Sequence, residues 1–416
     1  MSTHSFAWVV CLGLWLPGWA FAADADKPPE KSPEAAAAAW PNWRGPTHDG
    51  ISTEKGWLTT WPQEGLKQLW KVELGLGHSS VAILAGKVYS MGWTANQDTI
   101  FCLNADTGET VWKRPYLAAR ADYGSGPRAT PAVDGKAVYT LSADGQAFCL
   151  DAVSGQVLWK RNLQKELNLV MPMHGFSSSP VLEGELLLLN VGTAGLALDK
   201  KTGQPVWKSG GDSSYSSPVP YSLGGRRCVA LFAATQLTVV GLANGQRIAS
   251  CAWETKDNCN CADPVIAGDA IFVTSAYGVG CALIGVSGAN AAVTWKNKLA
   301  CHYANPVLVG DCLYALFSTG WLKADLVCVS VKDGAVRWTQ KDVGSGGLMV
   351  ADGKLLVLSR GGDLILAEAS PTAYTELARA RTSLADPCWN SPVLCDGRIY
   401  ARNEKGTLVC LDVRGK

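Results

Sequence analysis

LNADTGETVWK (103–113) predicts a strand, a turn and a second strand. Asp106-Thr107-Gly108 is a turn signal, because glycine tolerates a positive φ and the Asp and Thr side chains can bond the turn backbone. Trp112 follows this glycine by four residues. The same pattern returns as LDAVSGQVLWK (150–160) and LALDKKTGQPVWK (196–208), which indicates a repeated structural unit.

A second repeated segment shows how many units the chain contains. Segments that begin with proline, such as PAVDGKAVY (131–139) and PVLCDGRIY (392–400), recur about every 43 residues. With Ala82 and Met349 standing where proline is absent, eight units begin at 82, 131, 180, 218, 264, 306, 349 and 392. Each unit predicts four short strands, A to D, and none shows a sustained helical period. We therefore predict an all-β fold, an eight-bladed β-propeller of four-stranded antiparallel blades.

The end of the chain predicts how the ring closes. The last unit, PVLCDGRIYARNEKGTLVCLDV (392–413), supplies strands A, B and C before the sequence stops at Lys416. KQLWKVEL (67–74) precedes the first unit and has the pattern of a D strand. We expect this N-terminal strand to complete the last blade, which removes an open sheet edge. The predicted propeller domain spans residues 69–416.

Three segments precede the propeller. Residues 1–22 predict a signal peptide, because an apolar run ends in Ala20-Phe21-Ala22, a small-x-small cleavage pattern. The alternative, a membrane anchor, is disfavoured because the run is short and contains Pro17 and Gly18. Residues 23–40 predict a flexible tether, and residues 41–68 a lead-in segment. We expect an exported protein, periplasmic or secreted, with no transmembrane span in the mature chain.

Composition and charge limit the classes of partner that the protein is expected to bind. The net charge is +1 and no basic run is present, which argues against nucleic-acid binding. We expect a monomer. Fourteen cysteines are present, and Cys11 lies in the signal segment. Five of the others cluster in sequence, where a disulfide would suit an oxidising compartment: Cys251, Cys259, Cys261, Cys281 and Cys301. Cys259-Asn260-Cys261 lacks the second paired unit of typical zinc sites, so no metal site is assigned.

The recurring tryptophans predict a structural device. A fixed distance from the turn glycine would put each indole at the same place on each blade, where it can stack on a neighbouring blade and donate its N–H to backbone. A set of binding aromatics is the alternative, but identical residues spread around a ring do not converge on one ligand. The predicted docking residues are Trp70, Trp112, Trp159, Trp207, Trp253, Trp295 and Trp338.

This pattern resembles the tryptophan-docking repeat of the pyrroloquinoline quinone (PQQ) family. One branch comprises quinoprotein alcohol dehydrogenases; the other comprises non-enzymatic propellers similar to the assembly lipoprotein BamB. WPNWRGPTHDGIS (40–52) also resembles the lead-in of exported PQQ-repeat proteins. The BamB resemblance implies an envelope protein or peptide as partner, with outer-membrane assembly machinery as one candidate. The poor lipoprotein signal around Cys11 departs from that lipid-anchored branch.

The enzymatic branch implies PQQ with calcium over the central channel, two adjacent cysteines in a disulfide, Glu, Asn and Asp calcium ligands, and long insertions that roof the site. This sequence has no Cys-Cys pair and little material beyond the propeller. We therefore expect a non-catalytic scaffold without cofactor and assign no catalytic residue. The alternative is a small quinoprotein dehydrogenase that oxidises alcohols or sugars with PQQ at the channel mouth.

The segments that do not repeat are the candidates for function. A strands line the channel of a propeller, so the D-to-A connections surround one mouth, and here they differ from blade to blade. Exposed connections are often merely polar, but three of the five histidines fall in them. We expect a rim that binds a ligand or peptide, with the histidines too far apart for a metal. The candidates are His78, Arg128, His174, Phe176, Tyr215, His302, Tyr303 and Trp389.

Overall fold

A computed structural model describes residues 1, 39–118, 126–318 and 322–415. The chain divides into two units, Met1–Glu30 and Lys31–Lys416, and the fold described below belongs to the second. The predicted signal peptide and most of the predicted tether lie outside the described residues. Among the residues that are described, no helix has the length and apolar character needed to cross a membrane.

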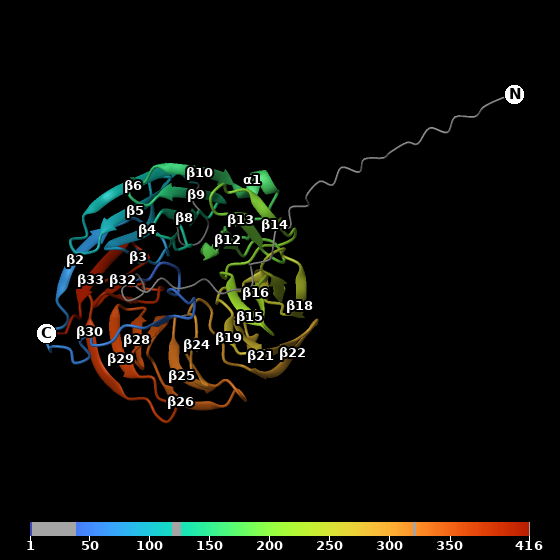
Figure 1. Ribbon diagram of the computed structural model, residues 1–416. Coiled ribbons are helices and arrows are strands. Elements are labelled where there is room, and N and C mark those ends of the chain that lie inside the picture. The colour runs from blue at the N-terminus through green and yellow to red at the C-terminus, as the bar shows by residue number, and fades with distance from the viewer. Residues whose placement is uncertain (2–38, 119–125, 319–321, 416) are drawn as a thin grey trace. The chain divides into compact units, whose positions relative to one another are not determined.

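Eight sheets, each built on four antiparallel strands, form a ring, so the predicted eight-bladed propeller is confirmed (Figure 1). The sheet of blade 7 has a fifth strand at its inner edge. Blade 1 is β3 (Ala82–Leu84), β4 (Lys87–Thr94), β5 (Gln97–Asn104) and β6 (Thr110–Leu117). Blade 2 is β7 (Ala132–Val133), β8 (Ala137–Leu141), β9 (Gln146–Asp151) and β10 (Val157–Asn162). Blade 3 is β11 (Val181–Glu183), β12 (Leu186–Leu189), β13 (Leu196–Asp199) and β14 (Pro205–Lys208). Blade 4 is β15 (Val219–Leu223), β16 (Arg226–Phe232), β17 (Gln236–Gly241) and β18 (Arg247–Ala252).

The second half of the ring repeats this plan. Blade 5 is β19 (Val265–Ala267), β20 (Ala270–Ser275), β21 (Gly280–Ser287) and β22 (Asn290–Asn297). Blade 6 is β23 (Val307–Val309), β24 (Cys312–Ser318), β25 (Ala324–Ser330) and β26 (Val336–Gln340). Blade 7 is β27 (Gly346–Ala351), β28 (Lys354–Ser359), β29 (Asp363–Glu368) and β30 (Glu376–Arg381). Blade 8 is β31 (Val393–Cys395), β32 (Arg398–Arg402), β33 (Thr407–Asp412) and β2 (Gln68–Glu73).

The predicted closure is also confirmed. Strand β2 from the N-terminal side pairs antiparallel with β33, and Trp70 lies opposite Cys410. Arg402 of blade 8 adds a second link across the closure. Its guanidinium donates to Met91 O of blade 1 (2.6 Å), and to Ser79 O (2.6 Å) and Gly75 O (3.0 Å) in the segment that leads into blade 1. Two short helices, α1 (Leu163–Leu167) and η1 (Lys256–Asn258), interrupt the connections between blades.

At six of the seven predicted docking positions the indole N–H donates to a backbone carbonyl of the next blade. Trp159 donates its indole N–H to Lys200 O at 2.9 Å, and its ring lies against Gly203 in the C-to-D turn of the next blade. A Cβ at Gly203 would come within 2.8 Å of that ring. Glycine is therefore required for close approach as well as for its φ of +68°. Equivalent indole-to-carbonyl bonds are made by Trp70, Trp112, Trp207, Trp295 and Trp338.

Trp253 is a correction to this prediction. In the strand pairing of blade 4, Ala249 occupies the position that the docking tryptophan holds in other blades, since it lies opposite Val239 on the C strand. Trp253 lies four residues farther along and donates to Ser275 Oγ at 3.0 Å instead of a backbone carbonyl. Accordingly, no indole packs on the glycine in the C-to-D turn of blade 5: Gly288 has no atom near its Cβ position. Blade 7 likewise holds Ala378 at the docking position.

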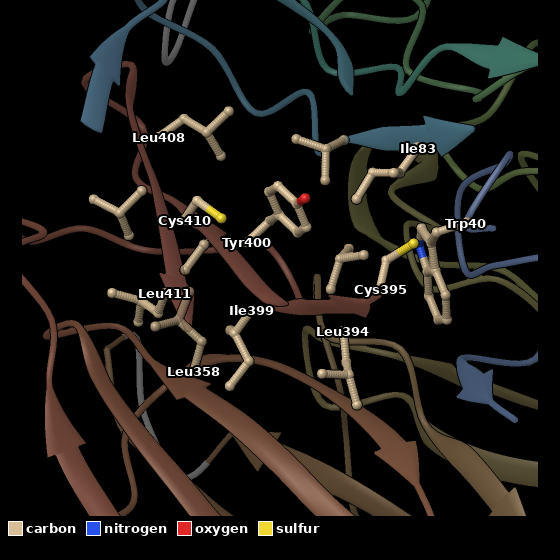
Figure 2. Close-up of a cluster of buried hydrophobic side chains, with 14 of the residues drawn as sticks. Trp40, Ile83, Leu358, Leu394, Cys395, Ile399, Tyr400, Leu408, Cys410 and Leu411 are labelled. Atoms are coloured by element: carbon tan, nitrogen blue, oxygen red, sulfur yellow. The ribbon is translucent and has the colours of Figure 1, made fainter. Parts of the chain in front are cut away.

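The lead-in segment runs along the inner strands of the ring. Trp40 forms an isolated bridge with Ile83 of blade 1, and β1 (Ile51–Ser52) pairs in parallel with β27 of blade 7. Between these points the Arg44 guanidinium donates to Pro306 O of blade 6 at 2.8 Å. The sequence placed Trp40 in the flexible tether, which is wrong, because its side chain is 3% exposed in the core. Figure 2 shows this core around Trp40, Ile83 and Tyr400.

Candidate functional site

A belt of hydrogen bonds fixes the start of the inner strands. In each bond the backbone N–H of one blade donates to a side chain of the next blade. The bonds are Ser80 to Thr130 (2.9 Å), Thr130 to Ser179 (3.0 Å), Ser179 to Ser217 (3.1 Å), Ser217 to Asp263 (2.6 Å) and Asp263 to Asn305 (2.6 Å). These six residues are therefore equivalent positions, and they give a common register for the D-to-A connections.

Five of the eight predicted mouth residues lie at one position in this register, two residues before the belt position or its counterpart Ser391. We call this position the rim. It holds several chemically different side chains, as expected for connections that are free to diverge. They are His78, Arg128, Tyr215, Tyr303 and Trp389, with Cys261 at the same position in blade 5.

The other three predicted residues lie off the rim. Phe176 is three residues before the belt and 1% exposed, packed in the core of blades 2 and 3. Because it is buried, Phe176 cannot contact a ligand at the mouth. Its position in a connection does not determine whether its side chain points to solvent or into the core. His174 lies farther upstream; its carbonyl accepts from Arg128 Nη1, and its N–H donates to Tyr215 Oη at 3.4 Å. His302, also three before the belt, is half-buried.

Burial and nearby positive charge keep the His78 imidazole at the mouth neutral. His78 contacts the neighbouring connection, because its backbone N–H donates to Pro127 O at 2.9 Å. Burial, together with the positive charges of Arg128 and Arg402, lowers the pKa of His78 to about 3. Because that pKa is far below neutrality, the imidazole of His78 is uncharged at physiological pH. The positive charge near His78 is carried by Arg128 and Arg402.

Another part of the mouth is aromatic. The rings of His302 and Tyr303 stack with centroids 3.8 Å apart, and Tyr303 meets Trp389 edge-to-face at 5.5 Å. Trp389 is held in turn by its indole N–H, which donates to Glu404 Oε2 at 2.8 Å. These rings border an open pocket of ≈ 370 Å³. Its lining includes Tyr277, His302, Tyr303, Leu316, Ser345 and Trp389.

Tyr277 was missed in the sequence, although a signal was available. It lies in the B-to-C turn of blade 5, with φ of +59°, and its ring meets His302 edge-to-face at 5.1 Å. Successive antiparallel strands run in opposite directions, so B-to-C turns emerge on the same face as D-to-A connections. Considering only the D-to-A connections therefore omitted half of the segments that surround the mouth.

Two cysteines and a histidine meet beside the pocket. Cys259 Sγ lies 3.6 Å from Cys261 Sγ and 3.6 Å from His302 Nε2. All three ligand atoms lie within 4.8 Å of one another. The disulfide considered for the clustered cysteines is not formed, because all thirteen cysteines in the described residues are free thiols. A hydrogen bond from Cys261 lowers the pKa of Cys259 to about 5, and His302 contributes in the same direction.

The residues at the mouth do not fit a calcium site. Calcium requires several oxygen ligands. Among the described residues, three or more His, Cys, Asp or Glu side chains converge only in the Cys259, Cys261 and His302 group, which contains no carboxylate. Both carboxylate oxygens of Asp263 already accept hydrogen bonds, one from the Ser217 N–H and the other from the Trp43 indole N–H at 2.7 Å.

Comparisons with known proteins agree with this architecture. A PQQ-repeat family described as outer membrane protein assembly factor BamB matches residues 96–340 and 322–416, and the chain belongs to this family. BamB from Moraxella catarrhalis is similar in structure, with 15% identity and a TM-score of 0.62, covering 83% of this chain and 99% of that one. Quinohemoprotein alcohol dehydrogenase from Comamonas testosteroni has 14% identity and a TM-score of 0.67, covering 92% and 81%. At these identities the likeness concerns the fold alone. No curated protein matches the chain in sequence.

Proposed function

We propose that this BamB-like propeller is an exported, non-catalytic binding scaffold of the cell envelope. Its mouth binds an apolar or aromatic segment of a partner protein or peptide. The observation that carries the proposal is the run of ring contacts from Tyr277 through His302 and Tyr303 to Trp389, which borders the pocket. Aromatic side chains of this kind supply large contact area at low entropic cost in protein recognition.

Exposed apolar side chains extend the same surface. Met171 and Met173 in the connection before blade 3 are 45% and 65% exposed, and Tyr303 is 49% exposed. Methionine adapts its shape to different partners, so it is common on peptide-binding surfaces. The pocket volume lies within the range of about 300–1,000 Å³ that ligand sites occupy. These features support binding of a side chain in the pocket with the partner backbone lying across the mouth.

The lead-in segment supports the mouth as the binding surface. Trp40, Arg44 and Ile51 contact the inner strands of blades 1, 6 and 7, so they occupy space that an empty propeller would leave along its axis. A ligand at the mouth would therefore rest on a closed floor.

Site-specific photo-crosslinking in intact cells tests the proposal. A photoreactive residue replaces Tyr303 or Met173 at the mouth, or Val293 on outer strand β22, which is 46% exposed and serves as the matched control. We expect one defined envelope protein to be crosslinked from both mouth positions and not from Val293.

Two outcomes contradict the proposal. One is the same crosslinking pattern from Val293 as from the mouth. The other is dye-linked oxidation of alcohols or sugars by the purified protein after addition of PQQ and Ca²⁺, accompanied by a rise in melting temperature.

A further inference from the structure

We propose that Cys259, Cys261 and His302 form a zinc site at the mouth, with three protein ligands and a fourth position open to the pocket. The site joins two connections that are far apart in sequence: the two cysteines precede blade 5 and the histidine precedes blade 6. It does not depend on the binding partner suggested above.

The cysteine segment is held in place by the residue between the two thiols. Asn260 is fully buried, and its amide donates to Ala233 O at 2.9 Å and Ala234 O at 3.0 Å. Its Oδ1 accepts from Ser275 Oγ at 2.7 Å, and its backbone carbonyl accepts from Ser214 Oγ at 3.0 Å. With Asn260 fixed on blades 4 and 5, the two sulfur atoms meet on the side that faces His302.

The histidine is held by packing as well. The stacked ring of Tyr303 and the edge-to-face ring of Tyr277 fix the plane of the imidazole from two directions. The preceding residue, Cys301, is buried and its N–H donates to Thr274 Oγ1 at 2.9 Å. His302 Nε2 is therefore presented to the thiols by neighbours in blade 5 and on its own connection.

Two of the three ligand separations match zinc coordination, and all three ligand atoms lie within 4.8 Å of one another. With Zn–S near 2.3 Å and Zn–N near 2.0–2.1 Å, a tetrahedron places two sulfurs roughly 3.8 Å apart and a sulfur and nitrogen roughly 3.6 Å apart. The observed separations are 3.6 Å for Cys259 Sγ to Cys261 Sγ and 3.6 Å for Cys259 Sγ to His302 Nε2. A disulfide would require an S–S distance of about 2.0 Å. Thiolate and imidazole ligands together select zinc over calcium or magnesium.

Three ligands leave one tetrahedral position for water or for a side chain of a bound molecule, the arrangement that distinguishes open zinc sites from closed structural ones. His302 itself lines the pocket, as does Tyr277, whose ring contacts it, so we place the open position on the pocket side of the imidazole.

Metal titration of the reduced full chain tests the site. Zn²⁺ is titrated in competition with a chromophoric chelator, and Co²⁺ is added separately, because thiolate ligation gives a charge-transfer absorption in the near-ultraviolet. We expect one equivalent of Zn²⁺ to bind and Co²⁺ to show that absorption. Cys259→Ser, Cys261→Ser and His302→Ala should each weaken Zn²⁺ binding by at least about 100-fold, because loss of a ligand exceeds the 10–100-fold cost of losing a supporting residue.

Cys251→Ser is the matched control, since this partly exposed thiol lies in the same region outside the cluster. It should bind Zn²⁺ like the unaltered chain. The Co²⁺ spectrum of the unaltered chain tests thiolate ligation even where a variant folds poorly. The proposal is overturned by absence of Zn²⁺ binding to the reduced chain, by unchanged affinity in the three ligand variants, or by binding of Cu(I) without Zn²⁺.

Discussion

Replacing Gly203 with alanine, alone and together with Trp159→Ala, tests how neighbouring blades dock. Two costs are expected for Gly203→Ala. The φ of +68° disfavours any L-residue by about 1–2 kcal/mol, and the new Cβ, 2.8 Å from the Trp159 ring, adds about 1–3 kcal/mol of overpacking. Trp159→Ala alone should cost about 3–5 kcal/mol, because it removes a buried ring and leaves the Lys200 carbonyl without its donor.

The two changes should compensate each other. In the Trp159→Ala background the steric cost of Gly203→Ala disappears and only the φ cost remains, so the coupling free energy should be about 1–3 kcal/mol. Gly184→Ala is the matched control, because Gly184 has φ of +58° but no atom near its Cβ position. Urea unfolding of the four proteins measures the cycle. A coupling below about 0.5 kcal/mol would refute docking of the indole on the glycine.

Two further predictions concern buried charges. Arg402→Met should lower the free energy of unfolding by about 3–5 kcal/mol, because it leaves the carbonyls of Ser79, Met91 and Gly75 unsatisfied at the ring closure; an unchanged urea midpoint would contradict this role. Burial raises the pKa of Asp98 to about 7, above its unfolded value near 4, so the native chain loses up to about 4 kcal/mol of stability as pH rises between these values. Asp98→Asn should remove that slope, and urea midpoints from pH 4 to pH 8 that fall equally in both proteins would exclude Asp98 as its source.

The repeat predicts the parts of the fold that follow a fixed register. Eight innermost strands, the closing β2 strand and six docked tryptophans were all predictable, since each is defined by its distance from a turn glycine or an inner strand. Trp253 was assigned from tryptophan spacing alone. Counting four residues from Gly245 would have pointed to Ala249, which is the residue that the strand pairing places there.

Features outside the repeat could not be predicted in the same way. Trp40 and β1 follow no register, so nothing in their sequence shows that they pair with inner strands of the ring. Phe176 lies in a connection, but its side chain turns into the core. Cys261 and His302 are close because adjacent blades bring adjacent connections together. The orientation of their side chains depends on contacts of Asn260 and Tyr303 with other parts of the fold, which the local sequence does not show.

The central claim is that the non-repeating connections assemble a specific site at the mouth, and X-ray absorption at the zinc edge tests it most directly. For the reduced full chain loaded with one equivalent of Zn²⁺, we predict two sulfur neighbours at about 2.3 Å and an imidazole nitrogen at about 2.0 Å. The sulfur contribution should fall by half in Cys259→Ser and remain unchanged in Cys251→Ser. A zinc environment of oxygen and nitrogen alone would contradict the site.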